Sequence, residues 1–267
     1  MSAVAPPFPY YGGKRKLAPW ITDLMPTHDG YIEPFFGSGA VLFSKRPARR
    51  EIVNDADGEI VNFFRALREH PTRLAASCRL TPYARDEHAD KTPPTNDLDR
   101  ARRFYAKVGQ SFSHGTGNSG WACGSGRASG NRARSFQSNI DRFNQIADRL
   151  ANVVIENCDA ADVIRRYATE SDVVYCDPPY VHDTRGEPEA YACEMSDDDH
   201  RNLAETLHET KATVLVSGYD NTLYRELFDG WHTETQSTHS TVASDPGMSE
   251  RVETIWANRK LNTGRLW

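Results

Sequence analysis

The stretch GYIEPFFGSGAVLFS (residues 30–44) decides the fold class, because a short apolar segment leads through a glycine turn into a second apolar segment. This order predicts a strand, a tight turn and the start of a helix. The same order returns at 50–69 and 152–168, and further strands are predicted at 172–180 and 212–220. Strands that alternate with helices form a mainly parallel, doubly wound sheet. The sequence therefore predicts an α/β fold.

Three later segments complete the predicted order. Ser196 is typical of an N-cap, and the three aspartates directly after it suit the first turn of a helix over about 197–209. The segments 231–238 and 251–259 alternate apolar with polar residues, which predicts two late strands as a partly exposed pair. Ligands of doubly wound sheets bind at the carboxyl ends of the strands. We therefore expect the functional residues in the turns that follow the strands.

The alternation of strands and helices breaks between about 70 and 135. This region predicts a single helix, followed at 111–135 by a stretch rich in Gly, Ser and Asn that is typical of a flexible loop or a hairpin. We expect residues 1–69 and 151–267 to form one domain, and residues 70–150 to form an inserted subdomain.

The composition is that of a globular protein, with 38% hydrophobic and 26% charged residues in a chain of 267. No apolar run approaches the roughly 18–20 residues that span a bilayer, and the start of the chain lacks the features of a signal peptide. We therefore expect a cytoplasmic protein. Five scattered cysteines, odd in number and never spaced as Cys-x-x-Cys, disfavour a zinc site or a disulfide framework, and no metal is expected.

The charge is distributed unevenly along the chain. A formal net charge of −5 argues weakly against a nucleic-acid partner. Residues 100–150, however, contain nine Lys and Arg residues against two Asp, which gives this window a local charge of +7. Such a cluster is typical of a surface that binds a phosphate backbone, and the alternative is a solvated charged face. The side chains that we expect at a nucleic-acid surface are Trp121, Arg127, Arg132 and Arg134.

The first glycine turn, EPFFGSGAV (33–41), suits a ligand that approaches the backbone closely. Gly37 and Gly39 carry no side chain, and the helix that follows offers free N–H donors. The third glycine of dinucleotide-binding turns is missing, which disfavours a nicotinamide or flavin cofactor. Asp55 ends the second strand, where a carboxylate can accept hydrogen bonds from ribose hydroxyls. The alternative is a turn residue or a helix N-cap, with Asp57 beside it.

The segment YYGGKRKL (10–17) joins two aromatic rings, two glycines and a basic cluster. Lys14 suits a ligand carboxylate, and an aromatic ring of this segment suits a cation. Basic clusters near the start of a chain are also common on solvated surfaces, so the segment alone leaves both interpretations open.

The stretch DVVYCDPPY (172–180) ends a strand with a carboxylate, two prolines and an aromatic ring. The exocyclic amine of adenine or cytosine is a poor nucleophile, because its lone pair is delocalised into the ring. If the Asp177 carboxylate and the Pro178 carbonyl accept its two hydrogens, the lone pair becomes available to attack a methyl group. Pro178 and Pro179 fix the turn, and Tyr180 can stack on a base that has left the duplex. The alternative is a strand that simply stops at a turn.

The segments YYGGK, EPFFGSG, VNDAD and CDPPY, in this order and spacing, resemble those of the Dam-type (D12 class) adenine-N6 DNA methyltransferases. The resemblance extends over about 8–260. The order of the cofactor segment, the insert and the catalytic segment resembles the alpha group of this family. The insert and the stretch VLVSGYDNTLY (214–224) resemble its phage and mobile-element branch.

The resemblance implies the Rossmann-like fold of S-adenosylmethionine-dependent methyltransferases, with S-adenosylmethionine as the cofactor and double-stranded DNA as the substrate. Residues 70–150 would then form the target-recognition subdomain. Asp159 is expected to bind the amino group of the cofactor adenine or, equally, to cap the next helix. The resemblance implies cofactor contacts at Tyr10 (or Tyr11), Lys14, Pro34, Phe35, Gly37, Gly39, Asp55 and Asp177, and a catalytic motif of Asp177, Pro178, Pro179 and Tyr180.

We therefore expect a bacterial or phage-encoded enzyme that methylates N6 of a flipped adenine at a specific DNA site. The alternatives are a cytosine-N4 methyltransferase and a catalytically idle nucleic-acid-binding module with the same fold. Asp177 favours adenine, because a serine often replaces it in the cytosine-N4 class. A cognate restriction enzyme is a candidate partner. The sequence leaves open the recognition sequence, for which GATC is only a guess, and the oligomeric state.

Overall fold

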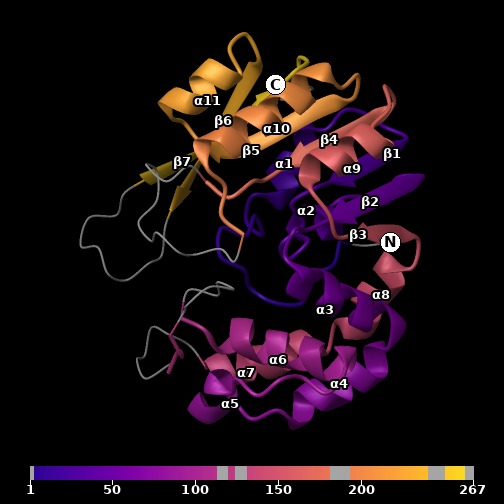
Figure 1. Ribbon diagram of the computed structural model, residues 1–267, viewed down its shortest axis with the longest axis vertical. Helices are drawn as coiled ribbons and strands as arrows, with labels where there is room; N and C mark the ends of the chain where they lie inside the picture. The colour runs from indigo at the N-terminus through magenta and orange to yellow at the C-terminus, as the bar shows by residue number, and fades with distance from the viewer. Residues whose placement is uncertain (1–2, 113–119, 124–130, 181–192, 240–249, 262–267) are drawn as a thin grey trace, which may run out of the picture.

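A seven-stranded sheet forms the centre of the molecule (Figure 1). The structure is a computed structural model that describes residues 3–112, 120–123, 131–180, 193–239 and 250–261. The strands are β1 (Gly30–Glu33), β2 (Arg50–Asn54), β3 (Val153–Glu156), β4 (Asp172–Cys176), β5 (Thr213–Tyr219), β6 (His232–His239) and β7 (Glu250–Ala257). Within the described ranges their order across the sheet is β3-β2-β1-β4-β5-β7-β6.

The strand directions confirm the predicted α/β fold with a mainly parallel, doubly wound sheet. Strands β1 to β5 are parallel, and Ile32 of β1 is aligned with Ile52 of β2 on one side and with Val174 of β4 on the other. β7 runs antiparallel between β5 and β6. Because β2 and β4 flank β1, the strand order reverses between β1 and β4. Ligands of such sheets bind at this switch in strand order.

Helices cover both faces of the sheet, because successive residues of a strand point to opposite sides. Tyr31 and Val53 pack into one apolar layer, and Ile32 and Ile52 pack into the other. The first layer includes side chains of α1 (Ala18–Leu24), α2 (Ala40–Ser44) and α3 (Gly58–Glu69), and the second includes side chains of α9 (Ala160–Tyr167), α10 (Asp197–Glu209) and α11 (Thr222–Leu227). None of the described helices is long and apolar enough to cross a bilayer.

A group of helices from the predicted insert lies at one end of the molecule, next to α3 (Figure 1). This helical group consists of α4 (Pro71–Leu80), α5 (Arg85–Ala89), α6 (Asp97–Gln110), α7 (Arg132–Ile140) and α8 (Phe143–Leu150). Phe63 of α3 stacks on Tyr105 at a centroid distance of 6.1 Å and meets Phe143 edge-on at 5.9 Å. These rings belong to the apolar layer that also covers the sheet. The helical group therefore packs against the sheet domain through a continuous core.

The predicted elements of the sheet domain agree closely with the structure. The helix expected at 197–209 is α10, and Ser196 and Asp199 form a reciprocal capping box at its start. The two late strands are β6 and β7, although they are unequal in burial. β7 lies inside the sheet with Glu253 to Trp256 buried, whereas β6 forms the edge.

The structure corrects the expectation of a single helix early in the insert. Two additional helices, α4 and α5, precede α6, and two more, α7 and α8, follow it before β3. α4 buries only Leu74 and Cys78, and α5 buries none of its residues. Such short helices lack the apolar periodicity on which a prediction from sequence depends.

Candidate active site

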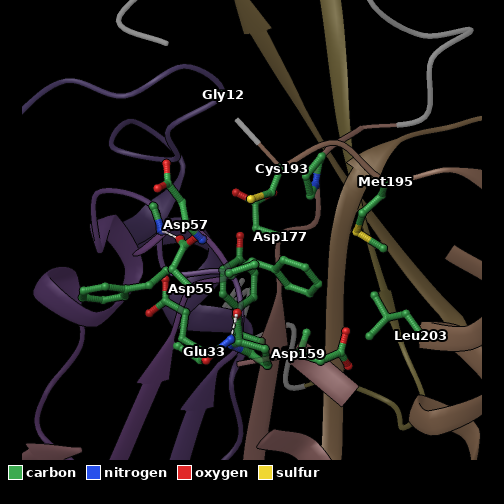
Figure 2. A pocket seen from close by; sticks show the side chains of 18 of the residues that line it. Gly12, Glu33, Asp55, Asp57, Asp159, Asp177, Cys193, Met195 and Leu203 are labelled. Atoms are coloured by element: carbon green, nitrogen blue, oxygen red, sulfur yellow. Dashed lines mark hydrogen bonds between the residues drawn. The ribbon is translucent and has the colours of Figure 1, made fainter. Parts of the chain in front are cut away.

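A cavity of about 550 Å³ opens at the carboxyl ends of β1, β2 and β4, beside the switch in strand order. Figure 2 shows Asp55, Asp159 and Asp177 around this one cavity, although they follow three different strands. Gly39, Pro178 and Tyr180 are not part of the cavity lining. The predicted residues that line the cavity are Tyr10, Lys14, Pro34, Phe35, Gly37, Asp55, Asp159, Asp177 and Pro179.

The turn after β1 carries two glycines with different tasks. Gly37 has a φ of +50°, and a Cβ there would lie 3.1 Å from the ring of Tyr10. Gly39 has a φ of +73°, and a Cβ there would lie 2.5 Å from the ring of Phe36. Gly37 therefore lets an aromatic ring of the N-terminal segment close over the turn, whereas at Gly39 both the left-handed backbone and the packing against Phe36 exclude a side chain. Tyr10 and Tyr11 both line the cavity.

Asp55 joins the turn after β1 to the end of β2. Its Oδ2 accepts the Gly37 N–H at 2.8 Å, and its Oδ1 accepts the Asp57 N–H at 2.9 Å. Burial raises the pKa of Asp55 to about 7, although the backbone donors lower it. Asp57, by contrast, caps α3 by accepting the Glu59 N–H. The capping role thus falls to Asp57, and each oxygen of Asp55 keeps a lone pair for a further hydrogen-bond donor.

The opposite wall of the cavity combines apolar side chains with an acid. Phe35, Met195 and Leu203 contribute apolar surface. Asp159 caps α9 by accepting a backbone N–H at 2.8 Å and also lines the cavity. The capping role is thus observed, and the contact with the cofactor adenine stays a prediction. Sequence reasoning missed the segment 193–203, because it marks a helix start and carries no motif of its own.

Lys14 binds the predicted catalytic carboxylate directly. Its ammonium lies 2.7 Å from Oδ1 of Asp177 and 3.5 Å from Oε1 of Glu253, and its side chain is almost fully buried. Burial opposes the charged form, but the two carboxylates together raise the pKa of Lys14 well above its ordinary value. The ammonium therefore stays protonated. Its predicted contact with the carboxylate of the cofactor stays a prediction.

Tyr180 is held by its hydroxyl group and its ring. The hydroxyl accepts the Lys14 ammonium at 2.5 Å and donates to Glu253 at 3.0 Å. The ring lies 4.6 Å from that of Tyr219 between centroids, and only 8% of the residue is exposed. Stacking of this ring on a target base is not tested by these contacts and stays a prediction.

Glu33 is a buried acid in the cavity wall that the sequence analysis did not single out. It ends β1, directly before the Pro34 turn, and accepts the Tyr31 hydroxyl at 2.8 Å. Burial raises the pKa of Glu33 to about 8, and the hydrogen bond from Tyr31 lowers it. Its position next to the predicted turn was the available signal. A buried carboxyl in a ligand cavity is a common feature of functional sites.

The chemistry available in the cavity is that of carboxylates and a buried ammonium. Within the described residues, no three His, Cys, Asp or Glu side chains are grouped so that they could hold a metal ion. All five cysteines are free thiols. Carboxylates, backbone donors and aromatic surface suit a nucleoside with an attached charged group.

Comparison with protein families places this cavity in a known class. Residues 10–242 match the model of the D12 class N6 adenine-specific DNA methyltransferases. The chain belongs to this family. The match contains all four predicted motifs, from Tyr10 to Tyr180, and confirms the family predicted from the sequence.

Curated relatives are similar to this chain over either a short stretch or most of its length. A type II methyltransferase of Lactococcus lactis subsp. cremoris is 39% identical over 64 residues, which are 24% of this chain and 22% of that protein. The DNA N-6-adenine-methyltransferase of Escherichia phage P1 is 24% identical over 83% of this chain and 30% of its own length. A type II methyltransferase of Methanocaldococcus jannaschii is 23% identical over 86% of this chain and 89% of its own. The match thus spans less than a third of the first two relatives and most of the third.

The predicted nucleic-acid residues of this family member all lie between positions 121 and 134, and two of them contact side chains from other parts of the helical group. The ring of Trp121 lies under the guanidinium of Arg85 at 4.7 Å and beside Tyr83. Arg132 lies over the ring of Phe112 at 5.8 Å, and Phe112 is 65% exposed. Sequence reasoning missed Arg85, because it precedes the window in which the cations were counted.

The remaining two predicted residues are Arg134 and Arg127. Arg134 is exposed at the start of α7, and among the described residues its side chain has no partner. Arg127 lies outside the described residues. Arg85, Phe112, Trp121, Arg132 and Arg134 are called the cation–aromatic cluster below.

Most other cations of the helical group are paired within the protein. Arg102 binds Glu87 and Asp99, and Arg103 binds Asp90 and Asp99. Of these acids, Asp90 is 30% exposed and the others less, so the ion pairs lie near the surface but are only partly accessible to solvent. Part of the local charge of +7 in the window 100–150 is therefore neutralised by acids that precede the window.

Two further arginines of that window are structural. Arg149 binds Glu51 of β2 inside the protein, next to Lys45, and is 8% exposed. Arg142 donates to the backbone carbonyls of Ala5 and Pro6. These contacts fasten α8 and its start to the sheet domain and the N-terminal segment. They leave the cation–aromatic cluster as the better candidate for a polyanion.

Proposed function

We propose that this protein transfers a methyl group from S-adenosylmethionine to N6 of adenine in double-stranded DNA. The observation that carries the proposal is the position of Asp177. Its carboxylate follows β4 at the switch in strand order, opens on the same cavity as the Gly37 turn and Asp55, and is followed by two prolines. The family match supports the same reaction.

The residues around the cavity fit S-adenosylmethionine. Asp55 keeps acceptor capacity for a ribose hydroxyl beside its backbone donors, and Phe35, Met195 and Leu203 offer apolar surface to an adenine ring. Glu33 lines the cavity, and its carboxyl oxygen can accept a hydrogen bond from an ammonium group, which would favour its ionised form. When bound, S-adenosylmethionine supplies an electrophilic methyl group on a sulfonium.

Asp177 prepares the target amine for attack. Its carboxylate and the carbonyl of Pro178 accept the two hydrogens of the amine, which draws the nitrogen towards tetrahedral geometry and frees its lone pair. Pro178 and Pro179 fix the turn, so both acceptors are in position before the base arrives. The target base must leave the duplex before it can enter the cavity, as is general for enzymes that act on a base in duplex DNA.

Lys14 is the cationic partner of Asp177. Its ammonium lies 2.7 Å from Oδ1 of the carboxylate and holds it from the buried side. The carboxylate is therefore positioned as a hydrogen-bond acceptor for the incoming amine.

The cation–aromatic cluster supplies the proposed contact with DNA. Arginines meet phosphates, and exposed rings such as Phe112 suit stacking on bases. The helical group, within the predicted inserted subdomain at 70–150, would then be the target-recognition part of the protein. This division into a catalytic and a recognition part is a proposal that rests on the position of the cluster.

Two further inferences, on the location of the enzyme and on a partner, accompany the proposal. DNA as the substrate implies a cytoplasmic enzyme of a bacterial or phage-infected cell. Two of the relatives bear type II names, which supports a restriction endonuclease of the same specificity as a functional partner.

The proposal is tested with purified protein, methyl-labelled S-adenosylmethionine and duplex DNA of mixed sequence. The DNA is digested to nucleosides, and the labelled nucleosides are separated. We expect label in N6-methyladenine only. Label in N4-methylcytosine would replace adenine by cytosine as the target. Binding of S-adenosylmethionine and DNA without any transfer would favour the catalytically idle module.

A further inference from the structure

A buried polar network lies against the cavity and holds the catalytic carboxylate. It joins Lys14 of the N-terminal segment, Asp177 after β4, Ser217 of β5 and Glu253 of β7. Ser217 is fully buried and Glu253 is 3% exposed, and neither lines the cavity. Both side chains therefore act on the cavity through Asp177 and Lys14.

Both donors in this network bind the same oxygen of Asp177. The Lys14 ammonium lies 2.7 Å from Oδ1, and the Ser217 hydroxyl donates to Oδ1 at 2.8 Å. Within the described part of the chain, Oδ2 has no hydrogen-bond partner. The Asp177 side chain is 20% exposed, so its carboxylate is held from the buried side and open on the other. Oδ2 is thus the oxygen available to a target amine.

The hydroxyl proton of Ser217 has a defined direction. A serine hydroxyl carries one proton, and the carbonyl of Cys176 is farther away, at 3.3 Å, than Oδ1 of Asp177. The hydroxyl of Tyr175 lies 2.9 Å from the Ser217 oxygen. Once Ser217 donates to Asp177, Tyr175 must donate to Ser217. The three groups therefore form a directed chain from Tyr175 to the carboxylate.

Glu253 holds the other side of the network. It accepts the Tyr180 hydroxyl at 3.0 and 3.3 Å, and it lies 3.5 Å from the Lys14 ammonium. The ammonium also donates to the Gly12 carbonyl at 3.2 Å. One ammonium is thus shared between two carboxylates. Glu253 competes with Asp177 for the Lys14 ammonium, because opposite charges in a buried site interact strongly. Asp177 therefore stays a stronger acceptor than it would be with the whole ammonium to itself.

We propose that Ser217 and Glu253 are positioning residues for methyl transfer. Ser217, together with Lys14, occupies Oδ1 and so directs Oδ2 to the target amine. Glu253 shares the Lys14 ammonium and fixes the hydroxyl of Tyr180, which keeps Asp177 a strong acceptor. This inference rests on the proposed function and assigns its carboxylate a supporting set of residues outside the cavity.

Two substitutions and a matched control test the inference. Ser217→Ala removes the donor to Oδ1, and Glu253→Gln removes a charge while it keeps the shape. Thr254→Val is the control, because Thr254 neighbours Glu253 on β7, is 4% exposed, and its hydroxyl has no hydrogen-bond partner among the described residues. The measurements are the single-turnover rate, the Kd of S-adenosylmethionine, the Kd of DNA and the melting temperature.

We expect Ser217→Ala and Glu253→Gln each to lower the single-turnover rate by about 10- to 100-fold, because a misplaced acceptor is costly in this range. Both Kd values should stay within about twofold, which a general loss of structure would not allow, and Thr254→Val should match the wild type in rate. If the wild type is active and all three variants match its rate, this inference is overturned while the proposed function stands. A fall in rate that follows weaker cofactor binding would also overturn it. A wild-type protein that methylates no DNA would overturn the proposed function and this role with it.

Discussion

The cavity and the helical group both contain many charges, but they use them in different ways. At the cavity, one ammonium is shared by two carboxylates, of which Glu253 is buried and Asp177 remains open on one side. In the helical group, Arg102 and Arg103 are each bound by two acids. The cavity thus keeps a reactive group exposed to a ligand, whereas the helical group neutralises several of its cations with acids of the same protein.

This difference shows what a charge count along the sequence can predict. The window 100–150 has an excess of cations, yet Arg102 and Arg103 bind Glu87 and Asp90, which lie before it. Arg85 and Arg132, which form no ion pair in the described structure, lie over the aromatic rings of Trp121 and Phe112. The partners of each cation, and not their sum, therefore indicate a surface for DNA.

The first prediction has the largest expected effect and concerns the cavity. Asp177→Ala should lower the single-turnover rate of methyl transfer at least about 10³-fold, because the acceptor of the target amine is lost. The exposed acid Asp23 provides a control, and Asp23→Ala should leave the rate unchanged. A rate within tenfold of the wild type for Asp177→Ala would place the reaction elsewhere.

The second prediction concerns a cation of the helical group that is structural. Arg149→Ala leaves Glu51 with Lys45 as its remaining cationic partner in a buried site, so we expect a loss of about 3–5 kcal/mol in the free energy of unfolding. Denaturant unfolding measures this loss. Arg201 pairs with Glu226 on the surface, and Arg201→Ala should cost less than about 1 kcal/mol. Equal losses for both variants would mean that the buried Arg149–Glu51 pair stabilises the fold no more than the surface pair does.

The third prediction uses the raised pKa of Glu33, about 8 against an ordinary value of 4.5. The folded protein keeps this proton where the unfolded chain has lost it, so the stabilisation is complete below about pH 4.5 and is lost as pH rises to 8. The free energy of unfolding should then fall by about 1.4 kcal/mol per pH unit from this group between those limits. Glu33→Gln should flatten the curve between pH 6 and 8 in urea unfolding. Parallel curves for the two proteins would show that Glu33 is ionised in the fold.

The fourth prediction has the smallest effect and compares two arginines of the helical group. Arg134→Ala should reduce the slope of log K for DNA against log salt by about 0.9, if its guanidinium meets one phosphate. Arg103→Ala should leave the slope unchanged, because Asp90 and Asp99 already bind Arg103. Titrations of labelled duplex at several salt concentrations distinguish the two. Equal changes would mean that the paired arginines also reach DNA.

The sequence was sufficient for the fold and for the turns that carry the cavity. Each turn follows an apolar strand, so the sequence pattern alone assigns Gly37, Asp55 and Asp177 to the same edge of the sheet. Ser196 likewise marked the start of α10, because a cap is a local signal. These predictions depend on neighbours in sequence, which is where sequence patterns are informative.

The supporting residues of the cavity could not be predicted in the same way. Lys14 and Tyr180 are hydrogen-bonded across 166 positions, and Ser217 and Asp177 across 40. Ser217 and Glu253 lie within ordinary strand patterns and belong to no motif. The pairing of Arg102 with Glu87 of α5 is equally remote from any local pattern. Contacts between distant elements depend on the packing of the whole chain.

Modified-base sequencing of genomic DNA from cells that express the protein tests the central claim most directly, with the Asp177→Ala variant expressed in parallel. We predict N6-methyladenine in one short sequence motif with the wild type and none with the variant. The same methylation with both proteins, or methylation of cytosine N4 with the wild type, would contradict the account.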